Sequence, residues 1–508
     1  MLRSISLENF KAYERLGELE LRPLTVFCGP NAVGKSSVVQ ALLMMRQTIN
    51  QQTGGHALPL ITDGEDVSLG DYVNVLFGHD LSRTMRIELT VPLTWGERGF
   101  WAKPLDLTLR FAYAPDIPAQ YAPQPDKWGW LYRFRAPMPD LVSLRLTAKD
   151  DNGRELLVVD MRQHGWDDYL NVLGLKVDVS FGEDMQRSDE HFEGPVAGMR
   201  HIEDWFDDTE RDGLTLNEWN DDCGAEQLVG LVSRMLQEAS RSLTVSYVGP
   251  AREAPQRYYD MDKRSTRDGA RRSSQGDWKT DIAQFGEISK VGRPLERWRR
   301  PSEHPAPRLD MRTGRTYSTT PIPASIPVDE VFNSWLSYLD LPEMHPVLEG
   351  RDFRFTVPSP YASGCSVSVT DTGYGVSQVL PILLAGLAGP GNIVVLDQPE
   401  LHLHPKVQTK IADFAIAIAE RRQVLVETHS DHFVNRVVRR VVEGQIESDD
   451  VAVYFLTPTP DGPDVKMVEV DPNFGIKNWP PGFFDDYADE QEAIIRASLK
   501  RRAEEGRN

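Results

Sequence analysis

The sequence predicts an α/β protein with a mixed N-terminal β layer, a parallel sheet flanked by helices, a long central insertion and a small C-terminal domain. Three observations carry this prediction. Apolar and polar residues alternate at the N-terminus and through 83–113, which is typical of antiparallel strands. From Val328 to about Val453, strand-like and helix-like segments alternate, as in a parallel sheet with helices on its faces. An apolar strand at Leu24–Cys28 leads through a glycine-containing loop into an apolar helix.

The composition is that of a globular protein. The chain has 508 residues, enough for two or three domains, with 40% hydrophobic and 26% charged residues. No apolar run approaches the roughly 18 residues that span a membrane, and the alternating N-terminus is unlike a signal peptide. Cys28, Cys223 and Cys365 lie far apart without metal-ligand spacing. These features favour a cytoplasmic protein with reduced thiols and no membrane partner.

Composition divides the chain into five regions. The α/β core is expected in two halves, 1–114 and 328–455. Between them lie an insertion at 115–245 and a segment at 246–327 that is rich in basic residues, glycine, proline and serine. Residues 456–508 hold a strand, an aromatic turn and an amphipathic helix, and are expected to form the small C-terminal domain.

Charge is distributed unevenly within this plan. Residues 181–225 hold fourteen Asp and Glu against three Arg, which indicates a solvated acidic surface or a mobile insertion; a metal-binding nuclease cluster is the alternative, without a spacing that singles one out. Residues 251–315 hold sixteen Lys and Arg against ten Asp and Glu. They predict a basic loop or a contact with the phosphate backbone of DNA or RNA. The net charge of −20 argues against a chain that coats nucleic acid all over.

The stretch "GPNAVGKS" fits the phosphate-binding pattern G-x-x-x-x-G-K-[ST], and it lies between a strand and a helix as that motif requires. Backbone N–H groups of such a loop and the helix N-terminus bind phosphates. Lys35 is expected to reach the β and γ phosphates of ATP, and the Ser36 hydroxyl to bind Mg²⁺. The candidate nucleotide-binding residues here are Gly29, Pro30, Asn31, Ala32, Val33, Gly34, Lys35, Ser36 and Ser37.

Two later strands complete the predicted site. "NIVVLD" ends in Asp397, which is expected to hold Mg²⁺ through water. The strand Gln423–Glu427 leads to His429, at the carboxyl end of a parallel strand, where ligands bind in such sheets. This histidine is expected to contact the γ-phosphate or the attacking water. A capping or core histidine is the alternative interpretation.

A second candidate anion site precedes "NIVVLD". In "TDTGYGVSQVL", Gly373 and Gly375 precede an apolar helix expected to start near Val376. Glycines at a helix N-terminus describe an anion site, which includes Ser377 and Gln378. This segment cannot easily serve the ATP that the first loop holds. The alternative is a tight turn needed for packing.

These elements, in this order, resemble the ABC-type ATPase heads of the SMC, RecF and OLD (overcoming-lysogenisation-defect) class. The segments that carry the resemblance are "ISLENFKAYERLGELELRPLTVFCGPNAVGKSSVVQALLM", "SYVGPAREAPQRYY", "TDTGYGVSQVLPIL", "LDQPELHLHP", "VETHSDHFVNRVVRR" and "WPPGFFDD". Together they look like a prokaryotic ATPase family with a short C-terminal domain of unknown function, whose genes often lie beside or within anti-phage defence modules. The resemblance covers 115–245 poorly.

The resemblance implies ATP and Mg²⁺ as cofactors and a homodimer or higher oligomer with ATP between two heads. Gly373–Gln378 of one head would contact the γ-phosphate held by Gly29–Ser37 of the other. It also implies an effector encoded nearby, a nuclease or toxin that this ATPase regulates. A RecF-like clamp on DNA is one alternative. An OLD-type nuclease is another, although "DDVAVYFLTPTPDGPDVKMVEVD" lacks the acidic constellation of its nuclease domain.

One position departs from the pattern of the class. Where the class has "DEP", this chain has "DQP", with Gln398 in place of the glutamate. An amide cannot take a proton from water, although it can orient water by hydrogen bonds. Glu400 either supplies the base, if the turn brings it inward, or shapes the dimer loop. His402 and His404 point to opposite sides of an extended segment, so a metal site is disfavoured. We therefore expect a slow ATPase.

Overall fold

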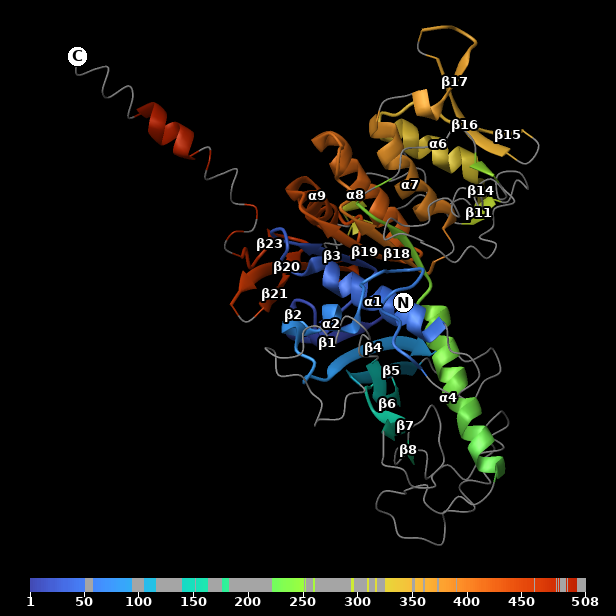
Figure 1. Cartoon of the computed structure of the whole chain (residues 1–508). Coiled ribbons are helices and arrows are strands. Elements are labelled where there is room, and N and C mark those ends of the chain that lie inside the picture. The colour runs from blue at the N-terminus through green and yellow to red at the C-terminus, as the bar shows by residue number, and fades with distance from the viewer. Residues whose placement is uncertain are drawn as a thin grey trace, which may run out of the picture.

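The computed structural model describes most of the two predicted core halves and parts of the regions between them. The described residues are 1–50, 58–93, 105–115, 139–150, 152–162, 176–181, 222–250, 252, 259–260, 294–296, 308–309, 316–317, 325–349, 352–359, 361–371, 374–389, 391–460, 462–480, 482, 484, 490 and 492–499. Two large sheets, with helices between and beyond them, form the body of the molecule (Figure 1).

The first sheet is antiparallel and has seven strands in the order β2-β1-β4-β5-β6-β7-β8. Its alternating sequence places every second side chain of β4 in the core, as the burial of Met85, Ile87, Leu89 and Val91 shows. The strands predicted within 83–113 and at 142–148 and 155–161 are confirmed. The bounds are β1 Ser4–Phe10, β2 Tyr13–Glu20, β4 Met85–Leu93, β5 Leu105–Pro115, β6 Pro139–Lys149, β7 Glu155–Arg162 and β8 Lys176–Phe181.

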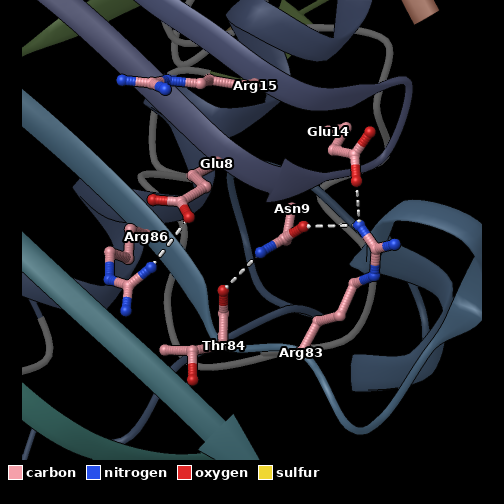
Figure 2. A pocket seen from close by; sticks show the side chains of 7 residues that line it. All are labelled: Glu8, Asn9, Glu14, Arg15, Arg83, Thr84 and Arg86. Atoms are coloured by element: carbon pink, nitrogen blue, oxygen red, sulfur yellow. Dashed lines mark hydrogen bonds and ion pairs between the residues drawn. The ribbon is translucent and has the colours of Figure 1, made fainter. Parts of the chain in front are cut away.

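A polar groove of about 330 Å³ lies between β1, β2 and the start of β4 (Figure 2). Two of its three arginines are already paired. Arg83 donates to Glu14 at 2.6 Å and to Asn9 at 3.2 Å, and Arg86 donates to Glu8 at 2.8 Å. Because these carboxylates neutralise two of the guanidinium groups, the groove is a poorer anion site than a set of free backbone N–H groups.

The second sheet has six strands in the order β21-β20-β3-β19-β18-β9, and all neighbours except β20 and β21 are parallel. Every residue of β3, β18 and β19 is buried, as in parallel strands covered on both faces. Its bounds are β3 Leu24–Cys28, β9 Val245–Val248, β18 Ile393–Asp397, β19 Gln423–Thr428, β20 Val451–Thr459 and β21 Gly462–Val468.

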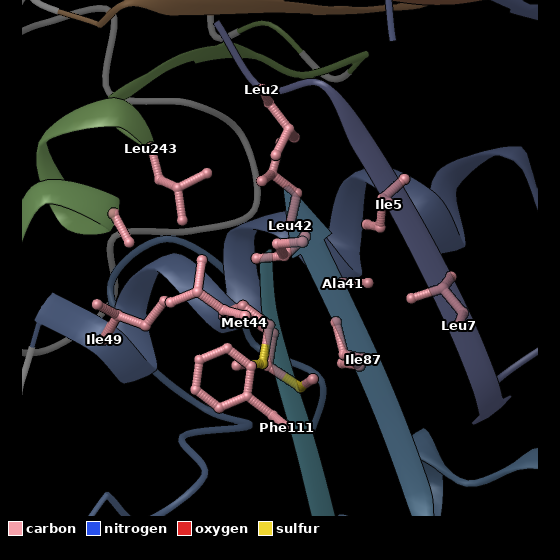
Figure 3. Close-up of a cluster of buried hydrophobic side chains, with 14 of the residues drawn as sticks. Leu2, Ile5, Leu7, Ala41, Leu42, Met44, Ile49, Ile87, Phe111 and Leu243 are labelled. Atoms are coloured by element: carbon pink, nitrogen blue, oxygen red, sulfur yellow. The ribbon is translucent and has the colours of Figure 1, made fainter. Parts of the chain in front are cut away.

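Alternate residues of the parallel strands enter two different cores. Val395 and Leu425 pack with α1, α4 and the antiparallel sheet, part of which Figure 3 shows. Val394 and Val426 pack on the opposite face with α6, α7, α8 and α9, where the ring centroids of Trp335 and Phe414 lie 4.9 Å apart. The helix bounds are α1 Lys35–Asn50, α4 Asp222–Ser242, α6 Val328–Tyr338, α7 Tyr374–Ala388, α8 Pro405–Ala419 and α9 Asp431–Val442.

This arrangement confirms the predicted α/β fold class, with an antiparallel N-terminal β layer and a parallel sheet flanked by helices. The expected boundary after residue 114 falls inside β5, and the antiparallel sheet continues beyond it. The expected boundary after residue 245 falls inside β9, which begins at that residue. Within the described residues, no helix is long and apolar enough to cross a membrane.

The smaller elements are α2 Tyr72–Val75, η1 Phe77–His79, β10 Tyr259–Asp260, β11 Pro294–Glu296, β12 Arg308–Leu309, β13 Thr316–Tyr317, β14 Ser325–Pro327, β15 His345–Glu349, β16 Asp352–Pro358, β17 Ser366–Ser368, η6 Val369–Asp371, η7 Ser448–Asp450, β22 Val470–Asp471 and β23 Gly475–Ile476.

Candidate nucleotide site

The phosphate loop joins β3 to α1, and its two glycines are required by the backbone. Gly29 has φ +140°, and a Cβ there would lie 2.3 Å from the carbonyl oxygen of Leu456 on β20. Gly34 has φ +98°, and a Cβ there would lie 2.9 Å from the Cβ of Ala12. A side chain at either position would combine an unfavourable φ with a steric clash. The loop conformation therefore depends on these two residues.

Lys35 lies buried above this loop. Its Nζ donates to the carbonyl oxygens of Gly29 at 3.1 Å and Pro30 at 2.6 Å. Burial lowers the pKa of Lys35, and the Glu427 carboxylate acts in the opposite direction. The hydroxyl of Tyr13 donates to the Gly34 carbonyl oxygen at 3.1 Å and so ties β2 to the same loop. The lysine is placed within reach of the space that the loop encloses.

Two carboxylates meet the loop at the carboxyl ends of the neighbouring strands. Asp397 on β18 and Glu427 on β19 are register partners, and β19 pairs directly with β3. The hydroxyl of Ser36 donates to Oε1 of Glu427 at 2.8 Å. The hydroxyl of Tyr247 donates to Oδ2 of Asp397 at 2.8 Å. Ser36 and Asp397 are both predicted from the sequence as magnesium ligands. Ser36 lies in the first turn of α1, after β3, and Asp397 ends β18; β3 and β18 flank β19, the strand that carries Glu427.

Three buried carboxylates of this site each keep one oxygen without a hydrogen-bond partner in the described part of the chain: Oδ1 of Asp397, Oε2 of Glu400 and Oε2 of Glu427. Burial raises the pKa of Asp397 and of Glu400. Burial and the Asp397 charge raise the pKa of Glu427 to about 7. A buried acceptor without a partner costs about 1–3 kcal/mol, so this cluster favours a bound cation.

These donors fit Mg²⁺. The ion prefers oxygen ligands and commonly takes one or two carboxylates together with phosphate and water. Among the described residues, no group of three or more His, Cys, Asp or Glu side chains is set to hold a metal by itself. Such a site would therefore draw part of its ligand set from the nucleotide, with the Ser36 hydroxyl and Asp397 as the protein ligands.

Glu427 is a site residue that is not predicted from the sequence. The pattern there indicates only a buried strand, yet the Glu427 side chain contacts the phosphate-loop serine. The sequence does contain a clue. Glu427 is a carboxylate that directly follows the apolar centre of its strand, and it lies beside Asp397 if the two strands pair in register.

The turn after β18 brings Glu400 inward. Gln398 has φ +47°, and its N–H donates to the Glu427 carbonyl oxygen at 2.7 Å. Two residues later, the buried Glu400 accepts the backbone N–H of His429 at Oε1, at 2.7 Å. The carboxylate predicted as a possible base therefore lies beside the predicted sensor histidine.

His429 is half-buried next to the phosphate loop. Burial and the Lys35 charge lower its pKa, while a hydrogen bond with the backbone of Gly29 acts in the opposite direction. An imidazole of lowered pKa is neutral at physiological pH and can both donate and accept. The histidine is therefore close to the loop, as predicted. His404, by contrast, caps α8, and its Nδ1 accepts the N–H of Lys406 at 3.2 Å.

The second predicted anion segment is described in part. Gly373 lies outside the described residues. The helix α7 begins at Tyr374, earlier than predicted, so Gly375 and Ser377 lie inside the helix. Gln378 is fully buried, and neither atom of its side-chain amide has a partner among the described residues. The arginines at 271, 272, 297, 299 and 300 and all of 182–221 also lie outside the described residues.

Comparisons with known proteins agree with this geometry. The AAA ATPase domain profile matches residues 1–88 and 310–434, and that of a protein of unknown function (DUF3696) matches 446–494. No curated protein matches the chain. Similar solved structures include the SMC head domain from Thermotoga maritima, at 12% identity and TM-score 0.34 over 92% of this chain and 99% of that chain.

Two further solved structures are SMC heads in complexes. One is an SMC head bound to the C-winged helix domain of ScpA, at 10% identity and TM-score 0.42, covering 92% of this chain and 98% of that chain. The other, derived from Pyrococcus furiosus, has an extended coiled coil and is bound to the C-terminal domain of ScpA; it shows 10% identity and TM-score 0.36, covering 98% of this chain and 99% of that chain.

The matched ATPase segments coincide with the site. They contain the phosphate loop, Asp397, Glu400, Glu427 and His429, which the fold brings together from the two ends of the chain. The chain is therefore similar to an AAA ATPase domain in two segments, which the fold brings together from its N-terminal and C-terminal parts.

Proposed function

We propose that the protein binds ATP with Mg²⁺ and hydrolyses it slowly, as an ATPase of the SMC and RecF class. The observation that carries this proposal is the contact between Ser36 and Glu427, beside an Asp397 oxygen that has no partner in the described part of the chain. This places oxygen ligands at the edge of the phosphate loop. Mg²⁺ bound there would neutralise charge on the β and γ phosphates during phosphoryl transfer.

The other residues of the site are assigned to the phosphates, the cation and the attacking water. The loop N–H groups and Lys35 would hold the phosphates, and the positive φ values of Gly29 and Gly34 support a loop that wraps around them. Glu427 contacts Ser36 and therefore lies on the cation side of the site. Glu400 lies beside His429, on the side where the γ-phosphate and the attacking water are expected.

We assign the general base to Glu400. Gln398 cannot accept a proton from water, whereas Glu400 has a raised pKa and one oxygen without a partner among the described residues. Catalysis by a base at position 400, two residues after the position where the class has its glutamate, is expected to be slow. The role of Gln398 is then to orient water through its amide.

The ATP-bound form is proposed to be a dimer of heads that persists because hydrolysis is slow. ATP held by Gly29–Ser37 of one head would contact the start of α7 in the other. Such a dimer acts as a timer that regulates an effector, a nuclease or toxin, in anti-phage defence. This part of the proposal rests on the resemblance in the motifs.

A RecF-like DNA clamp is the second candidate, favoured by the sixteen Lys and Arg within 251–315. An OLD-type nuclease is not proposed. The residues that a nuclease domain would need, after His429, instead form β20 and β21 of the ATPase sheet itself.

The test of nucleotide binding is Lys35→Ala. Titration with a fluorescent ATP analogue in Mg²⁺ should show saturable binding for the wild type and loss of binding for the variant, because Lys35 is the cation placed on the loop. Lys410→Ala is the matched control, since that lysine contacts Asp340 on the surface of the protein. Equal affinity of wild type and Lys35→Ala would contradict the site assignment.

A further inference from the structure

A buried arginine lies between the start of α7 and the turn that follows β18. Arg252 follows β9 by four residues and is 5% exposed. Its Nη1 donates to the carbonyl oxygen of Gln378 in α7 at 3.2 Å. Its Nη2 donates to the carbonyl oxygen of Gln398, in the turn after β18, at 2.7 Å. One guanidinium therefore joins the first turns of α7 to the turn that carries Gln398 and Glu400.

The geometry of this link makes it stiff. A guanidinium is planar, and its donors have a fixed relative direction. Hydrogen bonds from one guanidinium to two main-chain oxygens therefore fix the distance between α7 and the Gln398 turn. The Gln398 turn has little freedom of its own, because its N–H is bonded to the Glu427 carbonyl oxygen at 2.7 Å. A movement of α7 must therefore be transmitted to this turn or break a charge-assisted hydrogen bond.

The start of α7 contains a buried polar group that favours a change of its position. The Gln378 amide is fully buried, and both its atoms lack a partner in the described part of the chain. Such groups raise the free energy of the conformation that contains them. A shift of α7 that gives this amide a partner would lower the free energy, and Arg252 would carry that shift to the Gln398 turn.

We propose that Arg252 is a positioning residue that couples the start of α7 to the Gln398 turn, so that a nucleotide presented to α7 by a second copy sets the position of Glu400 in this copy. The inference rests on the proposed ATP-bound dimer. Its consequence is that the two nucleotides of a dimer promote each other's hydrolysis. Binding of ATP to a single head needs only the phosphate loop and is independent of Arg252.

The test compares Arg252→Met and Arg252→Lys with Arg422→Met. Arg422 is the matched control, because its guanidinium also donates to main-chain oxygens of α7, but toward the far end, at Ala385 and Gly386. Three quantities are measured for each protein: the thermal midpoint, the affinity for a fluorescent ATP analogue, and phosphate release as a function of ATP concentration.

The wild type should hydrolyse ATP with a Hill coefficient above one. Arg252→Met should keep the nucleotide affinity within about threefold, lower kcat by about 100-fold, as a displaced catalytic group does, and bring the Hill coefficient to one. Arg252→Lys, which retains the charge and one donor, should recover part of kcat. Arg422→Met should keep the wild-type Hill coefficient, whatever its effect on the thermal midpoint.

Several results would overturn the coupling while leaving the ATPase intact: a wild type without cooperativity, an Arg252→Met protein with unchanged kcat and Hill coefficient, or equal effects of Arg252→Met and Arg422→Met. Failure of the wild type to bind the ATP analogue would instead contradict the proposed function. If Arg252→Met does not fold, Arg252→Lys decides the matter, because reduced kcat at unchanged affinity supports the coupling and an unaltered kcat refutes it.

Discussion

Replacing Glu427 by glutamine should stabilise the nucleotide-free protein at pH 8 and leave its stability at pH 5 nearly unchanged. Burial and the Asp397 charge raise the pKa of Glu427 from 4.5 to about 7. In the unfolded chain this carboxyl ionises near its ordinary pKa, so between these two values the folded state binds more protons. Stability from this group is therefore lost as pH rises toward 7.

The magnitude follows from the two pKa values. A rise from 4.5 to about 7, at about 1.4 kcal/mol per pKa unit, costs the folded protein about 3 kcal/mol once the pH is above 7. Glutamine removes this cost and keeps an acceptor for the Ser36 hydroxyl, whose contact with Glu427 is 2.8 Å. At pH 5 the folded-state carboxyl is protonated and resembles the amide, so little change is expected there.

The assay is the denaturant midpoint of wild type and Glu427→Gln at pH 5 and pH 8, in a chelator and without nucleotide. Glu443→Gln is a control of opposite sign. Burial would raise the pKa of Glu443, but hydrogen bonds from Arg439 and Arg440 outweigh it and lower that pKa. Removal of the Glu443 carboxylate in Glu443→Gln should therefore destabilise the protein at pH 8. A destabilised Glu427→Gln protein at pH 8, or an equal gain at both pH values, would refute the reasoning.

Four other changes test the site and its surroundings. Glu400→Gln should lower steady-state phosphate release by about 10²–10⁴-fold, the usual effect of a lost general base, while Gln398→Glu changes it little; a rise of 10-fold or more in Gln398→Glu would show instead that the amide limits turnover. Gly29→Ala should abolish binding of the ATP analogue, because its Cβ would lie 2.3 Å from the Leu456 carbonyl oxygen; retained affinity would contradict the loop geometry. Replacing Arg271, Arg272, Arg297, Arg299 and Arg300 by alanine should weaken salt-dependent DNA or RNA binding in a filter assay, and a wild type without such binding would make 251–315 a solvated loop.

Local patterns predicted the parts of the site that depend on local geometry. The phosphate loop needs glycine at two backbone positions with positive φ, Gly29 and Gly34, so the motif itself encodes its conformation. The antiparallel strands β4 and β5 bury one side and expose the other, so their alternation is visible in the sequence. The buried run of β18 ends directly at Asp397, which made that residue predictable.

The missed parts depend on pairing between distant segments. Glu427 gains its place from the register of β19 with β18 and β3, which no local pattern specifies. Arg252 contacts main-chain oxygens, and such partners leave no trace in the side-chain sequence. The start of α7 was placed too late because glycine in a first helical turn costs little, since the first N–H groups of a helix have no intrahelical partner.

The glutamine at 398 makes physical sense beside these missed carboxylates. Burial raises the pKa of Asp397 and of Glu427. The Glu400 charge raises both further and the Asp397 charge raises that of Glu427, while Lys35 acts against both shifts and Arg252 against that of Asp397. A fourth carboxylate at 398 would add repulsion to a site in which three buried oxygens lack partners within the described residues. The amide avoids that cost, and the task of the base falls to Glu400, whose Oε1 is held by the His429 N–H. The proposed slow hydrolysis and a nucleotide-free state without this added repulsion would then both follow from Gln398.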